Sequence, residues 1–457
     1  MIVDENLPLG GTHLPTSNDM RKLLDIQDGN IIFKDSCVEY GKFKGKKCKF
    51  IKGTLSYMPK ACPNCLVLNK NYSLYRNGTQ ASRITLPMAG IYPTYLLLNK
   101  QRFMCKECLT TFTAKTPIVK KHCFITNAVK GHVLSKTAGA QSIKDIAREC
   151  TVSEATVQRV INQEAKKYQC YDRTLPTNLS FDEFKYASGK LAFEYINATT
   201  GDILDILSAR DGKTVKNHFT SRYHLHEREK VQTISIDMNA SYAGFIPCLF
   251  PNAKIIIDRF HIIQLINRSM NKTRVKVMNQ FNTSDGEDQK KYRRLKRYWK
   301  KILKKESNLS YTTYSYYSMF GQRIESAILS EMLDYDPTLR ATYILYQSII
   351  KAVEENDYDK LKEIVNETPS KDVSSLMETS LKTLRKHLSY IKNTFTYPYS
   401  NGRIEGINNK IKVLNRVAYG YRNFLNYKNR ILLHFNMKPK VDEKTNKKKK
   451  TTCPIAA

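Results

Sequence analysis

The sequence predicts an α/β protein of several domains, in which two small amino-terminal domains precede a larger α/β domain. Three observations predict this architecture. The chain has 457 residues, about three times the usual length of one domain. Two Cys-X-X-Cys pairs stand before a stretch of helical sequence. From residue 178 short apolar strands alternate with helices, and from residue 259 nearly all of the sequence has helical periodicity.

The chain carries a large positive charge. Lys and Arg number 75 against 42 Asp and Glu, which gives a formal net charge of +33. Such an excess is unusual for an enzyme of small neutral substrates, and it favours a polyanionic partner, of which nucleic acid is the commonest. The sequence has no run of 18 apolar residues and no secretory leader pattern, so we expect a cytoplasmic protein without a membrane partner.

The first motif is a double cysteine knuckle. Each Cys-X-X-Cys turn can direct two thiolates at one tetrahedral ion, so two turns predict a closed structural Zn²⁺ site in a zinc ribbon. The linker between the turns is longer than usual, which leaves His122 and Cys123 as substitutes. The alternatives are unlinked buried thiols or a redox pair. The predicted ligands are Cys62, Cys65, Cys105 and Cys108.

A helix-turn-helix pattern follows at residues 141–162. Ser153 is a suitable N-cap for the second helix, whose apolar face is formed by Val157, Val160 and Ile161. The remaining face would then be free to enter the major groove of DNA. An ordinary helical hairpin is the alternative. The predicted DNA-contacting residues of this helix are Thr156, Gln158 and Arg159.

Three aspartates mark the apolar strands of the larger domain. Asp182 lies within the strand LSFDEF, Asp237 ends VQTISID, and Asp258 ends AKIIID. A single carboxylate at such a place is most often a turn residue or a helix N-cap. Together, three antiparallel strands, a helix and a further strand ending in Asp describe an RNase H-like sheet. Glu405, on a later helix, best supplies a third metal carboxylate, and clustered carboxylates need divalent cations such as two Mg²⁺ ions.

These residues carry a family resemblance. The chain resembles a DDE transposase of a bacterial insertion sequence, named for two aspartates and a glutamate, and most resembles the ISL-three family. The resemblance covers most of the chain and rests on the knuckles, the helix-turn-helix, FDEF, SIDMNASY, IIIDRFHI and the block NGRIEGINNKIKVLNRVAYGYRNFLNYKNRILLHF.

The resemblance implies roles for particular residues. Asp182, Asp237 and Glu405 would form the metal-binding triad, and Asp258 with His261 would match a D-x-x-H signature that assists it. It also implies a helical insertion that interrupts the RNase H-like fold before the glutamate. Glu183 is a rival carboxylate, but strand alternation points it to the opposite face of the sheet.

The helix that carries Glu405 supports its assignment independently. Glu405, Asn408 or Asn409, and Lys412 are spaced to share one face, which suits a metal site and a scissile phosphate. The opposite face is predicted to be the core stripe Ile404, Ile407, Ile411 and Leu414. A plain amphipathic helix with a solvated polar face is the alternative.

Two further segments are strongly basic. Residues 290–305 carry ten Lys or Arg and no acid, which predicts one amphipathic helix that holds DNA phosphates, unless it is simply a solvated charged helix. Residues 438–450 form a Lys-rich tail. Tyr311, Tyr314, Tyr316 and Tyr317 resemble a base-stacking cluster, although helix packing is the simpler interpretation. The predicted phosphate contacts are Lys290, Lys291, Arg293, Arg294, Lys296, Arg297, Lys300 and Lys301, together with Lys412.

The fold prediction is an N-terminal zinc ribbon and helix-turn-helix, then an RNase H-like catalytic domain interrupted by an all-helical insertion. The expected segments are an extension (1–50), the zinc ribbon (51–125), the helix-turn-helix (126–172), the first catalytic part (173–264), the insertion (265–395), the last catalytic part (396–436) and the tail (437–457).

The predicted function is a transposase of the bacterial cytoplasm and nucleoid. It would bind the terminal inverted repeats of its element, cleave double-stranded DNA and join it to target DNA by two-metal phosphoryl transfer, as a homodimer or larger assembly. One alternative is a catalytically inactive, transposase-derived DNA-binding regulator. Another is a structure-specific or RNA-directed nuclease on the same fold.

Overall fold

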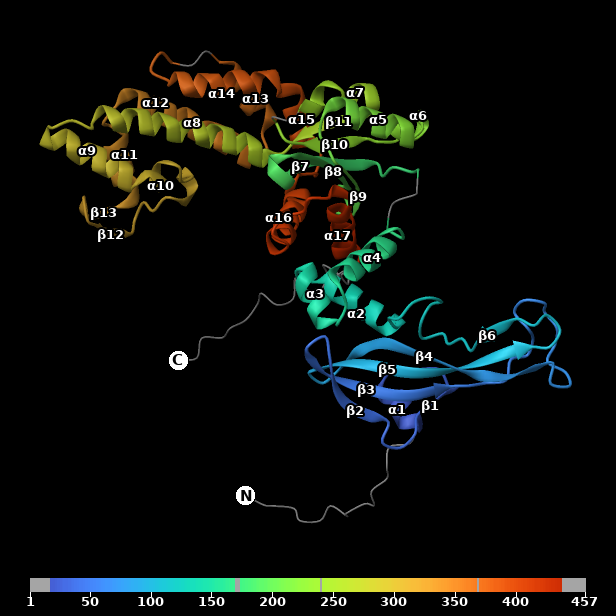
Figure 1. The fold of residues 1–457 in the computed structure, drawn as a ribbon. Helices are drawn as coiled ribbons and strands as arrows, with labels where there is room; N and C mark the ends of the chain where they lie inside the picture. Colours follow the sequence, from blue (N-terminus) through green and yellow to red (C-terminus); the bar gives the residue numbers. More distant parts are fainter. Residues whose placement is uncertain (1–16, 169–172, 239–240, 368–369, 438–457) are drawn as a thin grey trace, which may run out of the picture. The chain divides into compact units, whose positions relative to one another are not determined.

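The computed structural model describes residues 17–168, 173–238, 241–367 and 370–437. The chain forms two compact units, each with its own core (Figure 1). Unit 1 comprises Met1–Gln169 and Val413–Ala457, and unit 2 comprises Cys170–Lys412. The predicted Lys-rich tail lies outside the described residues. None of the described helices is long and apolar enough to cross a membrane.

Unit 1 contains a six-stranded sheet. The short β1 and the longer β2 both pair with β3, β3 runs parallel to β5, and β5 pairs with β4 in a long hairpin that turns at Gly90. The predicted boundary at residue 50 differs from this arrangement, because it falls inside β3. The elements are α1 (Ser17–Leu23), β1 (Ile31–Ile32), β2 (Val38–Phe43), β3 (Lys46–Leu55), β4 (Leu74–Ala89), β5 (Tyr92–Cys105) and β6 (Thr111–Thr113).

Four helices make a second core in unit 1. They are α2 (Asn127–Ala138), α3 (Ile143–Glu149), α4 (Glu154–Ala165) and, from the other end of the chain, α17 (Phe424–Asn436). Ser153 caps α4 by accepting a hydrogen bond from the Thr156 N–H, as predicted. Leu433 of α17 joins the apolar core of the three earlier helices. The sequence had placed residues 396–436 in the catalytic part, but α17 packs in unit 1 instead.

Unit 2 is built on a five-stranded mixed sheet in the order β11-β10-β7-β8-β9. The first three strands along the chain are antiparallel, and β10 and β11 continue the sheet parallel to β7. The five strands lie where the sequence predicts them. Their bounds are β7 (Asn178–Lys185), β8 (Leu191–Asn197), β9 (Ile203–Leu207), β10 (Thr233–Ile236) and β11 (Lys254–Ile257).

The two faces of this sheet differ in chemistry. Phe181, Phe193 and Tyr195 point to one face, where they pack with Phe219 and Phe250 in an aromatic core. The opposite face carries serines and acids, and α16 (Gly402–Val417) lies over it (Figure 1). The helices of the aromatic side are α5 (Gly212–Arg222), α6 (Leu225–Glu229) and α7 (Ile246–Leu249).

The rest of unit 2 is mostly helical, as predicted, with one exception. A two-stranded hairpin, β12 (Tyr314–Tyr317) and β13 (Gly321–Ile324), interrupts the segment that was expected to be all-helical. Aromatic residues favour strands, and Gly321 has the positive φ of +70° that the turn needs. The helices are α8 (Arg259–Gln280), α9 (Gly286–Arg297), α10 (Trp299–Ile302), α11 (Glu325–Leu333), α12 (Pro337–Glu354), α13 (Tyr358–Asn366), α14 (Ser375–Lys386), α15 (Leu388–Thr396) and α16 (Gly402–Val417).

Candidate active site and metal centre

Four cysteines converge at one point in unit 1. Their sulfur atoms all lie within 4.8 Å of one another. The Sγ atoms of Cys62 and Cys108 are 3.6 Å apart, and those of Cys65 and Cys105 are 3.7 Å apart. Four sulfurs placed about 2.3 Å from a central Zn²⁺ in a tetrahedron are separated by about 3.8 Å. The cluster therefore fits a closed four-thiolate zinc site, and among the described residues neither His122 nor Cys123 is needed as a substitute.

The two knuckles repeat the same local structure. In each, the N–H of the first cysteine donates to the carbonyl five residues later, from Cys62 to Val67 and from Cys105 to Thr110. The leucine after each knuckle has a positive φ, +60° at Leu66 and +54° at Leu109. Hydrogen bonds from Thr110 lower the pKa of the Cys108 thiol to about 5. A low thiol pKa favours the thiolate form that metals bind.

In unit 2, four acids form a row across the polar face of the sheet. Glu194 of β8 is the direct cross-strand partner of Asp182 of β7. Ser180 of β7 pairs with Ser235 of the parallel strand β10. Two residues further along both strands, the same register places Asp182 beside Asp237. Ile236 of β10 pairs with Ile257 of the parallel strand β11, so the next residue on each strand places Asp237 beside Asp258. We call Glu194, Asp182, Asp237 and Asp258 the acidic row.

Helix α16 and the residue before it hold three members of the row. The N–H of Asn401 donates to Asp258 Oδ2 at 2.6 Å, and its Nδ2 donates to Asp237 Oδ1 at 3.3 Å. Asn408 Nδ2 donates to Asp182 Oδ2 at 2.7 Å. The structure thus selects Asn408 rather than Asn409 for the face that meets the row. The predicted core stripe of α16 is confirmed, since all four of its residues are buried.

His261 lies between two of the predicted metal carboxylates. Its Nε2 is 2.5 Å from Asp237 Oδ1 and 3.7 Å from Glu405 Oε1. Asp258 caps α8, the helix that carries His261, by accepting a hydrogen bond from the Phe260 N–H. The interaction with Asp237 is the main reason that the pKa of His261 is raised. A protonated His261 would place a positive charge between Asp237 and Glu405.

Two acids of this site, Asp182 and Glu405, have raised pKa values. Burial is the main cause at Asp182, and the charge of Asp237 adds to it, so that the pKa of Asp182 rises to about 6. Burial and the charges of Asp258 and Asp237 also raise the pKa of Glu405, although His261 and Lys412 oppose them. Like charges brought together out of water destabilise the ionised forms. The positive charges near the site are therefore too few to neutralise its carboxylates.

Sequence reasoning missed two residues of this site. Glu194 is fully buried, and neither of its carboxylate oxygens has a hydrogen-bond partner. Burial, followed by the charge of Asp182, raises its pKa well above the usual range. Asn401 is also fully buried. The signal for Glu194 was an acid inside the apolar strand LAFEYIN, but only the register places it beside Asp182.

The rival carboxylate Glu183 lies on the other face of the sheet. It pairs with Arg210 and accepts a hydrogen bond of 2.8 Å from the hydroxyl of Tyr242. Tyr242 packs edge-on against Phe181 and Phe193, which belong to the aromatic core. Because Glu183 already has a cation and a hydroxyl as partners, it has little capacity left for a metal ion.

The donor set of the acidic row suits a hard divalent cation. Carboxylate and amide oxygens are the ligands that Mg²⁺ prefers. Besides Glu194, the amide oxygens of Asn401 and Asn408 are buried without a partner. The carboxylates are spread along the row, however. Within the described ranges only the cysteines come within 4.8 Å of one another as a group that could surround one ion.

For the helix expected to read DNA, the predicted core face is confirmed, but one of the predicted outward positions is wrong. Val157, Val160 and Ile161 are buried, as expected. Thr156 is also buried, with 8% of its surface exposed, and its hydroxyl accepts a hydrogen bond from Arg159. It therefore belongs to the helix start rather than to an outward surface. Arg159 is exposed and Gln158 is half-buried.

The basic segment is not one uniform cationic helix. It breaks at Tyr298 into α9 and α10, and six of its ten cations pair with acids of unit 2. Arg294 and Lys301 are among these six, with Glu331 and Glu325 as partners, so both stabilise the fold. The exposed cations for which the described structure contains no ion pair are Arg293, Lys296, Arg297 and Lys300.

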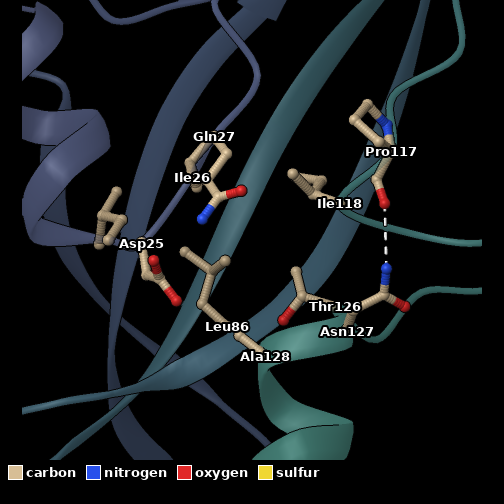
Figure 2. A pocket seen from close by; sticks show the side chains of 10 residues that line it. Asp25, Ile26, Gln27, Leu86, Pro117, Ile118, Thr126, Asn127 and Ala128 are labelled. Atoms are coloured by element: carbon tan, nitrogen blue, oxygen red, sulfur yellow. Dashed lines mark hydrogen bonds between the residues drawn. The ribbon is translucent and has the colours of Figure 1, made fainter.

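A separate pocket lies in unit 1, between the sheet and the start of α2 (Figure 2). Leu86, Ile118 and Ile26 give it an apolar lining, and the Asn127 side chain donates a hydrogen bond to the Pro117 carbonyl at its rim. No member of the acidic row and no knuckle cysteine lines it. The pocket is therefore not the candidate active site.

Comparisons with known proteins identify the family. The family model for ISL3-type DDE proteins, described as a transposase, matches residues 179–431, more than half of the chain. A relative named "Transposase for insertion sequence element IS1001", from Bordetella parapertussis, is 22% identical over 337 residues, which cover 72% of this chain and 79% of that protein.

A second relative has a different name. It is called "ATP-dependent protease", from Lactococcus lactis subsp. lactis, and is 42% identical over 109 residues. The match covers 24% of this chain and only 34% of that protein, so its name says nothing of the function of this chain. The family match, residues 179–431, includes α16 and all four acids of the acidic row. The chain belongs to the ISL3 family of DDE transposases.

Proposed function

We propose that the chain cleaves DNA at the ends of an insertion sequence and joins the freed ends to target DNA. One observation carries this proposal. In a chain of a transposase family, the acidic row lies beneath α16, this helix carries Glu405, and the site has too little positive charge to neutralise these acids. The strand order and the position of the row support an RNase H-like catalytic core.

The residues of the site would have different roles in catalysis. Asp182, Asp237 and Glu405 would hold two Mg²⁺ ions, while Asn401 and Asn408 keep two of these carboxylates in place. When bound, such ions activate the attacking water or 3′-hydroxyl and stabilise the leaving oxygen. His261 would hold or release a proton at Nε2 beside Asp237. Lys412 is exposed and close enough to lower the pKa of Glu405, so it is suited to contact the scissile phosphate.

Unit 1 would supply DNA recognition. The zinc ribbon would position the α2–α4 helices, and Arg159 with Gln158 would face the terminal inverted repeats. Exposed cations of α9 and α10 would hold phosphates without regard to sequence, which adds affinity that falls with salt. Two element ends must be joined, so we propose a homodimer or larger assembly on double-stranded DNA.

The test uses a labelled duplex that carries the end of the chain's own element. With Mg²⁺, the wild-type protein should nick at the end junction, and Glu405→Gln should not. Glu306→Gln is the matched control, because Glu306 is an exposed acid of the same unit and should leave nicking unchanged. Specific binding without nicking by wild type, in both Mg²⁺ and Mn²⁺, would instead support the inactive DNA-binding regulator. Equal nicking by wild type and Glu405→Gln would remove Glu405 from the triad.

A further inference from the structure

The hairpin β12–β13 has one packed face and one exposed face. Successive strand residues point to opposite faces, so Tyr314 and Tyr316 share one face while Tyr317 lies on the other. Tyr317 packs edge-on against Tyr298, and the ammonium group of Lys301 lies 4.5 Å from the centre of its ring. Arg294 fixes the turn by donating two hydrogen bonds to the Met319 carbonyl. The hairpin is therefore held on α9 and α10 through its Tyr317 face.

The other face presents bare aromatic rings. Tyr314 is 65% exposed and Tyr316 is 78% exposed, whereas Tyr343 and Tyr346 of the same unit are buried in its core. The cross-strand partner of Tyr316 is the exposed polar residue Gln322, which leaves the ring uncovered. Packing against helices, the simpler interpretation of these tyrosines, therefore holds for Tyr317 but not for Tyr314 and Tyr316.

The helices that hold the hairpin are cationic. The helices on which it rests carry Arg293, Lys296, Arg297 and Lys300, all exposed and outside the ion pairs of the described structure. Aromatic rings beside a positive surface are the combination by which proteins bind single-stranded nucleic acid, because cations take the phosphates and rings stack on the bases. A protein partner would have to cover this surface with acids.

The spacing of residues 314 and 316 along the strand also suits bases. Residues two apart on a strand are separated by about 6.8 Å, which is twice the stacking distance of about 3.4 Å between base planes. One base could thus enter between Tyr314 and Tyr316 and stack on both. In an intact duplex the base faces are covered by their neighbours, so this site would accept only bases that have left the helical stack.

We infer that the exposed face of β12–β13 is a binding site for unpaired bases of DNA. The inference rests on the proposed function, because it assumes that DNA is the partner of the chain. Tyr314 and Tyr316 provide the stacking surface, and the free cations of α9 and α10 contact the flanking phosphates. The hairpin would thereby distinguish opened DNA, such as a frayed or nicked element end, from intact duplex.

The experiment compares the affinity of the full chain for two duplexes of the same arbitrary sequence, without added Mg²⁺. One duplex is fully paired, and the other has a short run of unpaired bases that includes the fluorescent base 2-aminopurine. Wild type should prefer the opened duplex and quench its fluorescence. Replacing both rings (Tyr314→Ala with Tyr316→Ala) should lower the preference by about 10-fold or more, since stacking contributes about 1–3 kcal/mol per base. Affinity for the paired duplex should change by less than about 2-fold.

Matched variants separate stacking from other effects. Phe at both positions keeps the rings and should keep the preference, while Leu keeps apolar bulk and should lose it. Tyr72→Ala removes an equally exposed ring, 77% exposed, in unit 1 and should have no effect. Thermal melting should show the same stability for all variants, because neither ring is packed.

The outcomes are distinguishable. If wild type binds neither duplex, the proposed function fails. If it binds both equally well, only the hairpin inference fails. The inference is also overturned if the Ala variants change the oligomeric state in sedimentation but leave the preference for opened DNA intact, because the tyrosines would then serve a protein interface.

Discussion

Two buried acids of unit 2 have opposite surroundings. Glu325, at the start of α11, is 8% exposed and accepts hydrogen bonds from Lys301 at 2.7 Å and Lys304 at 2.6 Å. Burial by itself would raise the pKa of Glu325, but the two ammonium groups and the Ser310 N–H outweigh it and lower the pKa to about 2. At Asp182 burial is again the main cause and the charge of Asp237 adds to it. The hydrogen bonds from the Glu183 N–H and from Asn408 Nδ2 do not outweigh these effects, so the pKa rises to about 6.

The difference separates an acid that stabilises the fold from one that is kept for chemistry. Glu325 has its counter-charges built into the chain, so its ionised form is stable without a ligand. Three acids of the row, Asp182, Asp237 and Asp258, have amide N–H partners in place of Lys or Arg, and amides orient a carboxylate without neutralising it. Raised pKa values in such a cluster are typical of functional sites. The missing positive charge is the feature that a divalent cation would supply.

The largest expected effect tests this contrast directly. Asp237→Asn should abolish strand cleavage, with a loss of about 10²–10³-fold or more, because a metal carboxylate is removed. Glu325→Gln should retain cleavage, because Glu325 is part of the fold only. The measurement is nicking of an element-end duplex in Mg²⁺ by both variants, with circular dichroism as the folding control. Similar losses in both would show that the two kinds of acid do not differ in role.

The cysteine cluster differs from the acidic row, because its four sulfur atoms already lie at the distances that one metal ion requires. Cys105→Ser, or removal of zinc by a chelator, should unfold the knuckle region and lower the free energy of unfolding by several kcal/mol. The reason is that structural zinc sites contribute a binding free energy on the order of 10 kcal/mol. Zinc content and thermal melting check this. Cys248→Ser, which changes an exposed cysteine of unit 2, is the control and should keep both zinc and stability. Full zinc content in Cys105→Ser would contradict the site.

A smaller effect concerns pH. Because the pKa of Glu325 in the folded state is lowered, its contribution to stability is present above its unfolded pKa and is lost as pH falls toward about 2. Glu325→Gln should therefore lower the free energy of unfolding at neutral pH by about 2–3 kcal/mol and by much less near about pH 3. Denaturant unfolding at several pH values measures it. A difference independent of pH would assign the loss to packing rather than to charge.

The smallest effect concerns Glu194, whose pKa is shifted in the opposite direction from that of Glu325. Its raised pKa means that the folded state favours the protonated acid, so its stabilising contribution is complete at low pH and is lost as pH rises. Glu194→Gln keeps the shape and removes the ionisation, and it should stabilise the metal-free protein by about 1 kcal/mol at neutral pH. The gain should grow with pH in metal-free melts. A loss of stability that grows with pH would show that ionised Glu194 has a cationic partner.

Local pattern determined much of this protein. The alternation of apolar strands located all five strands of the unit 2 sheet, and helical spacing assigned the buried stripe of α16. The Cys-X-X-Cys turns predicted which four cysteines the structure brings together, because the geometry of each turn is set within a few residues. Strand alternation also separated Asp182 from Glu183. These features depend on neighbours in sequence, which is why the sequence alone could determine them.

Tertiary structure decided the rest. Only the strand register places Glu194 beside Asp182, and only the docking of α16 selects Asn408 over Asn409 and brings Asn401 to the row. The packing of α17 on α4 follows from contacts between residues far apart in the chain. Four of the six paired cations of the basic segment likewise gain their carboxylate partners from α11 and α12 on folding. Charge and periodicity indicate which side chains are available, whereas the pairing of distant elements determines which of them remain without a partner and are free to act.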